Sequence, residues 1–125
     1  MSGILGAGGS NSGLVGFPLI DITDKVSGAN SWVVSEHKLF IWNKIVFVNA
    51  RFQHSNPGAG EHVIGTIATG YWPVDVGYQS NNISYQGEYC DRVSFRTNGN
   101  IVAENCVVAG DNTFRIDLNV WYKTS

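Results

Sequence analysis

Histidine and cysteine are the residue types of this sequence best suited to metal binding or to nucleophilic catalysis. The three histidines, His37, His54 and His62, do not have the spacing of metal ligands. Neither of the two cysteines, Cys90 and Cys106, lies near a histidine in the sequence. Because a nucleophile needs a base beside it, the pattern predicts histidines on the surface or in loops, with no catalytic residue and no metal site.

The carboxylates and glycines do not form a pattern that is typical of an enzyme either. Asp21 and Asp24 could face one cation, but the segment lacks the dense oxygen ligands of a calcium loop, which favours a solvated turn. The other carboxylates are dispersed, so no acid–base pair can be assigned. The glycine-rich residues 6–9 follow no strand and open no helix, unlike a phosphate-binding loop. We therefore expect a protein that is not an enzyme and uses no cofactor.

Cys90 and Cys106 flank the strongest turn signal of the chain, the dipeptide Asn98-Gly99. A two-residue type I′ turn needs positive φ at both central positions, which this dipeptide tolerates. In the hairpin register that such a turn sets, Cys90 lies opposite Val107, and the two thiols point to opposite faces. A disulfide would then need a bulge or a longer turn, so we expect two free thiols in a protein that folds in a cytoplasm.

Aromatic and amide side chains are abundant in and beside the expected loops. Aromatic rings stack on the apolar side of sugar rings, while Asn, Asp, Arg and His exchange hydrogen bonds with hydroxyl groups. Tyr85 and Tyr89 are expected on one face of a strand, where they form a binding stripe if exposed and core if buried. The candidate ligand-binding residues, chosen by type and proximity to loops, are His54, His62, Tyr85, Tyr89, Asp91 and Arg92.

Alternating apolar and polar residues predict strands along most of the chain. In residues 45–53 one face holds Val46, Val48, Ala50 and Phe52, which we assign to the core. Residues 32–35 and 39–42 are expected as further strands, and residues 113–122 alternate cleanly, as in an antiparallel sheet with one wet face. About eight strand candidates with frequent turns indicate an all-β, antiparallel β-sandwich or jelly-roll-like domain. We place this domain at residues 19–125, after a glycine-rich neck or linker at residues 1–18.

Composition limits the classes of partner. The 125 residues suffice for one domain, and 14% of them are charged, well below the roughly 25% of typical soluble domains. The eight Lys and Arg residues are scattered singly and the net charge is −2, which argues against nucleic-acid binding. No apolar run approaches the length of a membrane helix, and the first residues do not resemble a signal peptide. We expect no membrane insertion and folding in a cytoplasm.

Four short motifs, in a fixed order, carry a family resemblance. They are residues 42–48 (WNKIVFV), 64–73 (IGTIATGYWP), 93–101 (VSFRTNGNI) and 120–125 (VWYKTS). With them, the chain from Ile20 to Ser125 resembles the C-terminal head domains of phage tail, baseplate and tail-fibre receptor-binding proteins. One departure is Trp72, which stands where that family often has arginine. Its ring either replaces the arginine by packing or is an exposed aromatic group that binds a ligand.

The resemblance implies a homotrimeric adhesion head in the virion, in contact with other tail or baseplate proteins. Its ligand would be a saccharide of the host cell wall or surface. The main alternative is a structural trimerisation module of a tail or baseplate without its own ligand. Two further alternatives are a cellular trimeric β-sandwich, such as a lectin or cytokine-like module, and an esterase or glycosidase, which a buried carboxylate pair would indicate.

Overall fold

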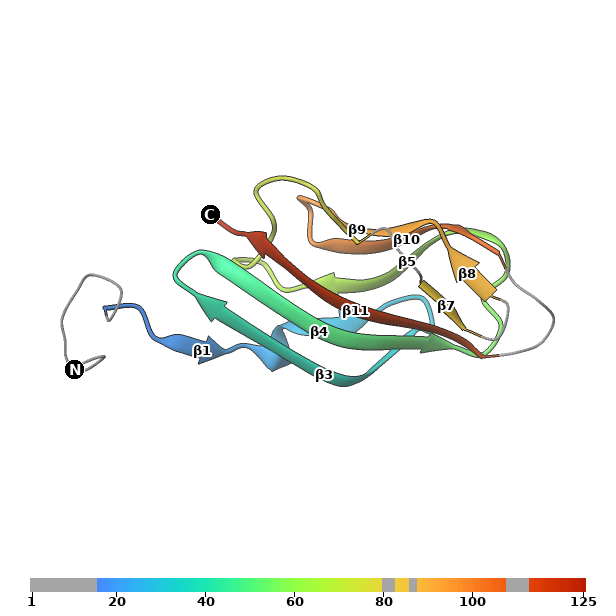
Figure 1. Ribbon diagram of the computed structural model, residues 1–125, viewed down its shortest axis with the longest axis horizontal. Helices are drawn as coiled ribbons and strands as arrows, with labels where there is room; N and C mark the ends of the chain where they lie inside the picture. The colour runs from blue at the N-terminus through green and yellow to red at the C-terminus, as the bar shows by residue number, and fades with distance from the viewer. Residues whose placement is uncertain (1–15, 80–82, 86–87, 108–112) are drawn as a thin grey trace.

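Two antiparallel sheets pack face to face in this protein, and a short hairpin extends one of them (Figure 1). The computed structural model describes residues 16–79, 83–85, 88–107 and 113–125, and for residues 78–79, 83–85 and 88 it describes the backbone alone. The prediction of an all-β antiparallel sandwich is confirmed. The predicted neck, residues 1–18, lies mostly outside the described residues.

The first sheet has four strands in the order β1-β3-β4-β11. They are β1 (Leu19–Asp21), β3 (Val33–Trp42), β4 (Ile45–His54) and β11 (Phe114–Lys123). Strands β3 and β4 form a hairpin, and β11 pairs with β4 along its whole length, from Phe114 opposite His54 to Lys123 opposite Ile45. The last strand in the chain is therefore an edge strand beside the central hairpin.

The second sheet has five strands in the order β2-β5-β10-β9-β6. They are β2 (Val26–Gly28), β5 (Gly60–Ile67), β10 (Asn100–Cys106), β9 (Arg92–Phe95) and β6 (Gly77–Gln79). A separate hairpin of β7 (Ile83–Tyr85) and β8 (Glu88–Cys90) joins the end of β10 through a bridge between Tyr89 and Val107. A short 3₁₀ turn, η2 (Thr23–Lys25), precedes β2, and no helix in the described ranges is long and apolar enough to cross a membrane.

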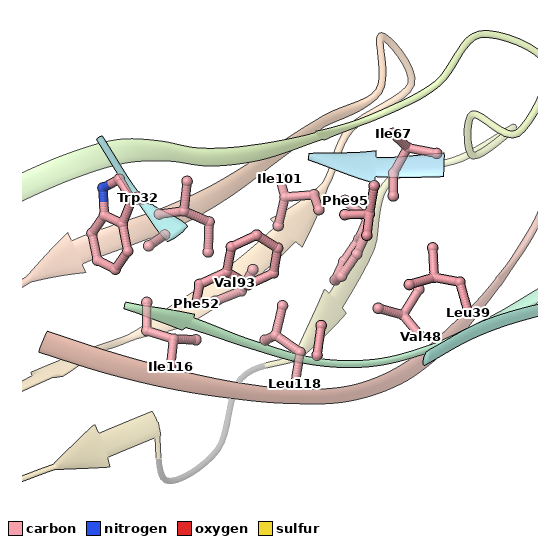
Figure 2. Packing of buried hydrophobic residues seen from close by; sticks show 14 of the residues in the cluster. Trp32, Leu39, Val48, Phe52, Ile67, Val93, Phe95, Ile101, Ile116 and Leu118 are labelled. Atoms are coloured by element: carbon pink, nitrogen blue, oxygen red, sulfur yellow. The ribbon is translucent and has the colours of Figure 1, made fainter. Parts of the chain in front are cut away.

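The core lies between the two sheets, where alternate residues of each strand meet. The face predicted for the core on β4 is confirmed, because Val46, Val48, Ala50 and Phe52 are at most 3% exposed. Figure 2 shows Phe52 and Leu118 meeting Val93, Phe95 and Ile101 from the opposite sheet. Burial of these apolar side chains is the main stabilising contribution to the fold, and it sends the intervening residues of each strand outward.

One continuous strand, β3, replaces the two strands expected at residues 32–35 and 39–42. The alternation that suggested two strands breaks at a β-bulge. Ser35 pairs with Arg51 and Lys38 pairs with Asn49, so two residues of β3 lie opposite Ala50 alone. The first residue in this bulge, Glu36, has a φ of +43°.

The turn between β9 and β10 is one residue longer than predicted. The N–H of Gly99 donates to the carbonyl of Arg96 (2.9 Å), and the N–H of Arg96 donates to the carbonyl of Asn100 (2.8 Å). Gly99 has a φ of +87°, whereas Asn98 does not have a positive φ. A type I turn followed by a left-handed residue fits this pattern, so the prediction of a two-residue type I′ turn is wrong.

The longer turn shifts the pairing of the two strands by one residue and brings the cysteines together. The pairs on either side of them are Arg92 with Glu104 and Tyr89 with Val107. Cys90 and Cys106 lie between these pairs, both on the core side, and a hydrogen bond joins their side chains, so the prediction that their thiols point to opposite faces is wrong. Both cysteines are buried and both are free.

Trp72 packs over the same turn. Its Nε1–H donates to the carbonyl oxygen of Ile67 (2.7 Å). A Cβ atom on Gly99 would collide with the indole nitrogen of Trp72 and would lie 2.8 Å from that same carbonyl oxygen. Of the two roles expected for Trp72, packing is the one that these contacts describe.

Candidate functional site

Two of the candidate residues, His54 and His62, pack around the buried Trp32. The ring centroids of His54 and His62 lie 5.3 Å and 6.1 Å from the ring of Trp32, which is 4% exposed. Nδ1 of His54 accepts the backbone N–H of Asn56 (3.0 Å), and Nε2 of His62 lies 2.8 Å from the carbonyl oxygen of Gly58. Both histidines therefore hold the loop after β4 against the core.

A shallow hollow of about 350 Å³ lies beside His54. Its lining residues are Ser31, Val33, Gln53, His54, Ser55 and Thr113. His54 is the only aromatic ring among them, and that ring is already in contact with Trp32. The hollow therefore combines small polar groups with the exposed side chain of Val33.

Three other candidates, Tyr89, Asp91 and Arg92, lie along β8 and the start of β9. Tyr89 is 44% exposed. Asp91 accepts a hydrogen bond from the side-chain amide of Asn105 (2.8 Å), and Arg92 donates to Glu104 (2.9 Å). Exposed Tyr89 remains available for contact, while Asp91 and Arg92 brace the end of the five-stranded sheet.

The last candidate, Tyr85, lies in β7, and its side chain is outside the described residues. The backbone of Tyr85 pairs with Glu88, and that of Tyr89 pairs with Ser84. The two tyrosines therefore belong to different strands of a hairpin, and the prediction that they share one strand is wrong.

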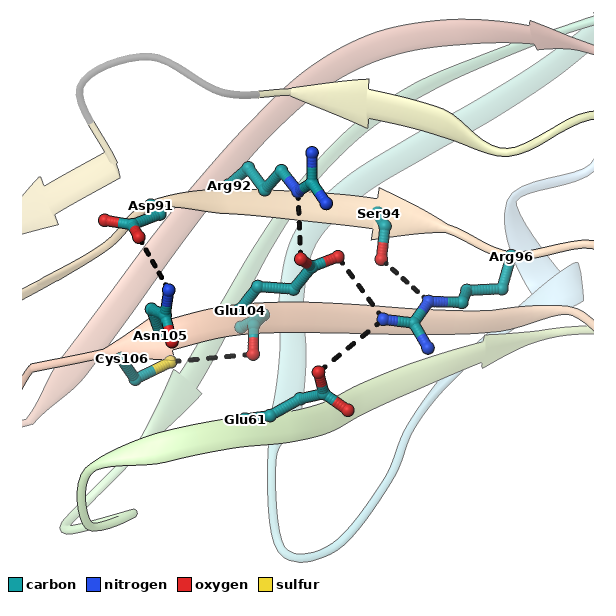
Figure 3. A network of polar contacts seen from close by, with 9 residues as sticks. Glu61, Asp91, Arg92, Ser94, Arg96, Glu104, Asn105 and Cys106 are labelled. Atoms are coloured by element: carbon teal, nitrogen blue, oxygen red, sulfur yellow. Dashed lines mark hydrogen bonds and ion pairs between the residues drawn. The ribbon is translucent and has the colours of Figure 1, made fainter.

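The outer face of the five-stranded sheet carries a network of ion pairs (Figure 3). Glu104 accepts from Arg92 (2.9 Å) and from Arg96 (3.3 Å), while Arg96 also reaches Glu61 (3.7 Å) and the hydroxyl of Ser94 (3.0 Å). Burial raises the pKa of Glu104, but hydrogen bonds from Arg92, Ser94 and Arg96 outweigh it and hold this pKa below its ordinary value. These charges stabilise one another.

The outer face of the four-stranded sheet carries a different set, which we call the polar row: Glu36, Asn49, Arg51, Asp117 and Asn119. Arg51 lies at its centre and donates from Nε to Asp117 (2.7 Å) and from Nη1 to Glu36 (2.6 Å). The polar row, together with Ala50 and Leu118, lines an open hollow of about 210 Å³. It presents amide, carboxylate and guanidinium groups in one place.

Strand register and the bulge in β3 assemble this row. Asn49 on β4 lies opposite Asn119 on β11, and the next outward pair is Phe47 opposite Trp121. Outward positions two residues apart are separated by about 7 Å along a strand. Phe47 is 41% exposed and Trp121 is 60% exposed, so one end of the polar row adjoins an aromatic pair. The bulge in β3 places Glu36 where its carboxylate accepts a hydrogen bond from Arg51 on β4.

This face presents groups that suit the binding of a ligand. Exposed aromatic rings present flat apolar surfaces, and the adjacent amides and carboxylates exchange hydrogen bonds with hydroxyl groups. The carboxylates of Glu36 and Asp117 are both bound to Arg51. No group of three or more possible metal-ligating side chains occurs within the described ranges.

The polar row and the aromatic pair were not among the candidates chosen from the sequence. Alternation assigns Asn49 and Arg51 to the wet face of one strand, and Asp117, Asn119 and Trp121 to the wet face of another. What alternation does not supply is the pairing of β4 with β11 and its register. That pairing is the signal that places these residues together.

Comparisons of this chain with family models, with curated proteins and with solved structures find no match. The resemblance to phage head domains therefore stands on the four sequence motifs. The sandwich fold and the two outer faces are observed in the structure itself.

Proposed function

We propose that this chain is a receptor-binding adhesion head of a phage tail or baseplate, and that it recognises a saccharide of the host cell surface. The observation that carries the proposal is the hollow of about 210 Å³ on the four-stranded sheet, lined by the polar row and adjoining Phe47 and Trp121. An aromatic platform beside amide and carboxylate groups suits a sugar ring, which has an apolar side and a rim of hydroxyl groups.

The size of the hollow sets the expected strength of binding. A site of this volume is smaller than the roughly 300–1,000 Å³ of typical ligand pockets and is open to solvent, so one head would bind one or two sugar units weakly. A homotrimer, and many trimers on one particle, would raise the overall affinity without new contacts. Other tail or baseplate proteins would hold those trimers in place.

One observation favours the alternative of a structural trimerisation module. A second, more apolar groove of about 180 Å³ lies on the other side of Trp121, lined by Val74, Val76 and Tyr122 among others. Val74 and Val76 are 45% and 39% exposed, so Trp121 and these valines form an apolar strip. Such a strip would be buried if copies of the chain associate through the edge of β11.

Replacement of one aromatic side chain tests the two functions together. Trp121→Ala should weaken binding to host cells and extracted wall polysaccharide by about tenfold, which is about 1.4 kcal/mol, because the sugar loses its stacking surface. Its melting temperature should stay close to that of the wild type, since the ring is 60% exposed. The matched control is Tyr89→Ala, which removes an exposed aromatic ring at a distant end of the sandwich.

The mass of each variant in solution separates the outcomes. A Trp121→Ala protein that keeps the wild-type oligomeric state and loses sugar-competed binding supports the adhesion function. A variant that dissociates into monomers supports the trimerisation module. Wild-type binding by Trp121→Ala and weakened binding by Tyr89→Ala would move the site to the β8 end of the sandwich.

A further inference from the structure

Cys90 and Cys106 face each other across two strands at the end of the five-stranded sheet. On one side of them Tyr89 and Val107 exchange two backbone hydrogen bonds, of 3.0 Å and 2.7 Å. On the other side Arg92 pairs with Glu104. Both strands have two residues between these pairs, and a side-chain hydrogen bond between Cys90 and Cys106 places their sulfur atoms next to one another.

The spacing of opposite residues in antiparallel strands suits a disulfide. Opposite Cα atoms are about 4.5–5.5 Å apart in a regular ladder, and disulfides join Cα atoms about 4.4–6.8 Å apart. The ladder is irregular beside the cysteines, where Asn105 has a φ of +53°, and the hydrogen bond between the two thiols is the contact that brings the sulfurs within reach. Cys90 and Cys106 are 5% and 2% exposed, so both lie on the core side. Asp91 and Asn105, the neighbours on the solvent side, hold the two strands together through a side-chain hydrogen bond of 2.8 Å.

The two thiols also interact with each other. The hydrogen bond with Cys106 and then burial raise the pKa of Cys90, whereas the same hydrogen bond lowers the pKa of Cys106. Cys106 also lies 3.8 Å from the carbonyl oxygen of Ala103 (Figure 3). The directions of these two pKa shifts favour the thiolate of Cys106 over that of Cys90, and the thiolate is the form that attacks a disulfide.

We propose that Cys90 and Cys106 form an oxidisable pair, which closes to an intramolecular disulfide by exchange with a low-molecular-weight disulfide. The Cys106 thiolate attacks the small disulfide, forms a mixed disulfide and releases one small thiolate. The Cys90 thiol loses its proton, and its sulfur attacks Cys106 and releases the second small thiolate. The protein loses two electrons and two protons, and the small disulfide is reduced to two thiols.

Burial of both sulfurs means that the exchange needs a local opening of β8. This strand has three residues and is joined to the end of β10 by a single bridge, so the opening involves a short segment. The reduced pair is expected in a reducing cytoplasm, and the disulfide is expected after transfer to an oxidising medium. Once formed, the bond ties the β7–β8 hairpin to β10. This inference does not depend on the proposed sugar binding.

The test treats the full-length protein, purified in reductant, with oxidised glutathione. Alkylation under denaturing conditions and intact mass spectrometry should then show a protein that has lost a pair of hydrogen atoms and takes up no alkylating reagent. Its melting temperature should rise by roughly 10 °C relative to the reduced protein, because the bond restricts the unfolded chain. Dithiothreitol should reverse both changes.

The control variants are Cys90→Ser and Cys90→Ala, which leave Cys106 without a resolving partner. Each should accumulate one glutathione on Cys106 and show no such rise in melting temperature. Two glutathione adducts on the wild type, disulfide-linked dimers, or two free thiols that persist even in mild denaturant would each overturn the proposal. If a variant folds poorly, the measurement on the wild-type protein still tests whether the disulfide forms.

Discussion

The two outer faces of the sandwich use similar polar residues in different ways. The five-stranded sheet carries a network of ion pairs among Glu61, Arg92, Arg96 and Glu104. On the four-stranded sheet, Arg51 binds two carboxylates in a similar manner, but the row continues into amides and then into exposed aromatic rings. Among the described side chains, no exposed aromatic residue lies on a strand of the five-stranded sheet.

This comparison indicates what distinguishes a structural charge network from a binding surface. Ion pairs alone say little, because surface pairs contribute only about 0–1 kcal/mol and occur on most proteins. The informative difference is the exposed Trp121 and Phe47, whose apolar surface remains in contact with water. A surface that keeps such rings exposed beside an open hollow is the better candidate for a ligand.

The largest effect should come from the turn that sets the register of the five-stranded sheet. Gly99→Ala should lower the free energy of unfolding by about 3 kcal/mol, because the positive φ at this position strains any residue with a side chain and the new Cβ atom would collide with Trp72. Chemical denaturation measures this loss. The matched control is Gly70→Ala, which has a φ of +100° and no atom near the new Cβ, and which should cost about 1 kcal/mol. Equal losses in both variants would show that the contact with Trp72 is not tight.

A smaller effect is expected from the charge network on that sheet. Glu104→Gln should cost about 1–2 kcal/mol near neutral pH, because three charge-assisted hydrogen bonds weaken. The folded-state pKa of Glu104 lies below its ordinary value of 4.5, so the ionised group stabilises the fold above that pH. This contribution disappears as the pH falls through the folded-state pKa.

Unfolding curves recorded from neutral to acidic pH check this prediction. The gap between wild type and Glu104→Gln should narrow steadily as the solution becomes more acidic than pH 4.5. The control variant Glu61→Gln, at the exposed rim of the network, should change the stability by less than about 0.5 kcal/mol. A gap that is constant with pH would mean that Glu104 contributes by packing and not by charge.

The smallest effect concerns the polar row. Asn49→Ala should weaken saccharide binding by about fivefold, or about 1 kcal/mol, because one hydrogen bond to a hydroxyl group is lost. Its stability should change by less than about 0.5 kcal/mol, since the residue is exposed on the outer face. Titration with wall polysaccharide fragments measures the binding. Thr66→Ala, an exposed polar position on the five-stranded sheet, should bind like the wild type; a loss there would remove the distinction between the two faces.

The fold was largely accessible to sequence reasoning, because alternation reports which side of a strand is buried. Val48 and Phe52 were assigned to the core from this pattern alone, and both are buried. Alternation does not report how strands are paired. The turn at Gly99 shifts the register of β9 with β10 by one residue from the predicted register. At Glu36, one strand continues through a bulge where two separate strands were expected.

The candidate site was less accessible for the same reason. His54 and His62 have side chains suited to ligand binding, but their rings pack on Trp32, a contact between distant segments that no local pattern reveals. Conversely, Asn49 and Asn119 are ordinary polar residues in the sequence, and only the register of β4 with β11 makes them neighbours. Sites that form across strands depend on pairing, which is a property of the whole chain.

The pairing of Arg51 with Asp117 has a consequence for how this protein acquires its surface. The two residues are 66 positions apart, so the chain must close a long loop before their contact forms. Contacts of this separation slow folding, because the entropy of closing the loop is lost before the contact stabilises the chain. The polar row therefore exists only in molecules in which β11 has paired with β4. A ligand or antibody specific for the polar row would bind completely folded molecules and would not bind partly folded ones.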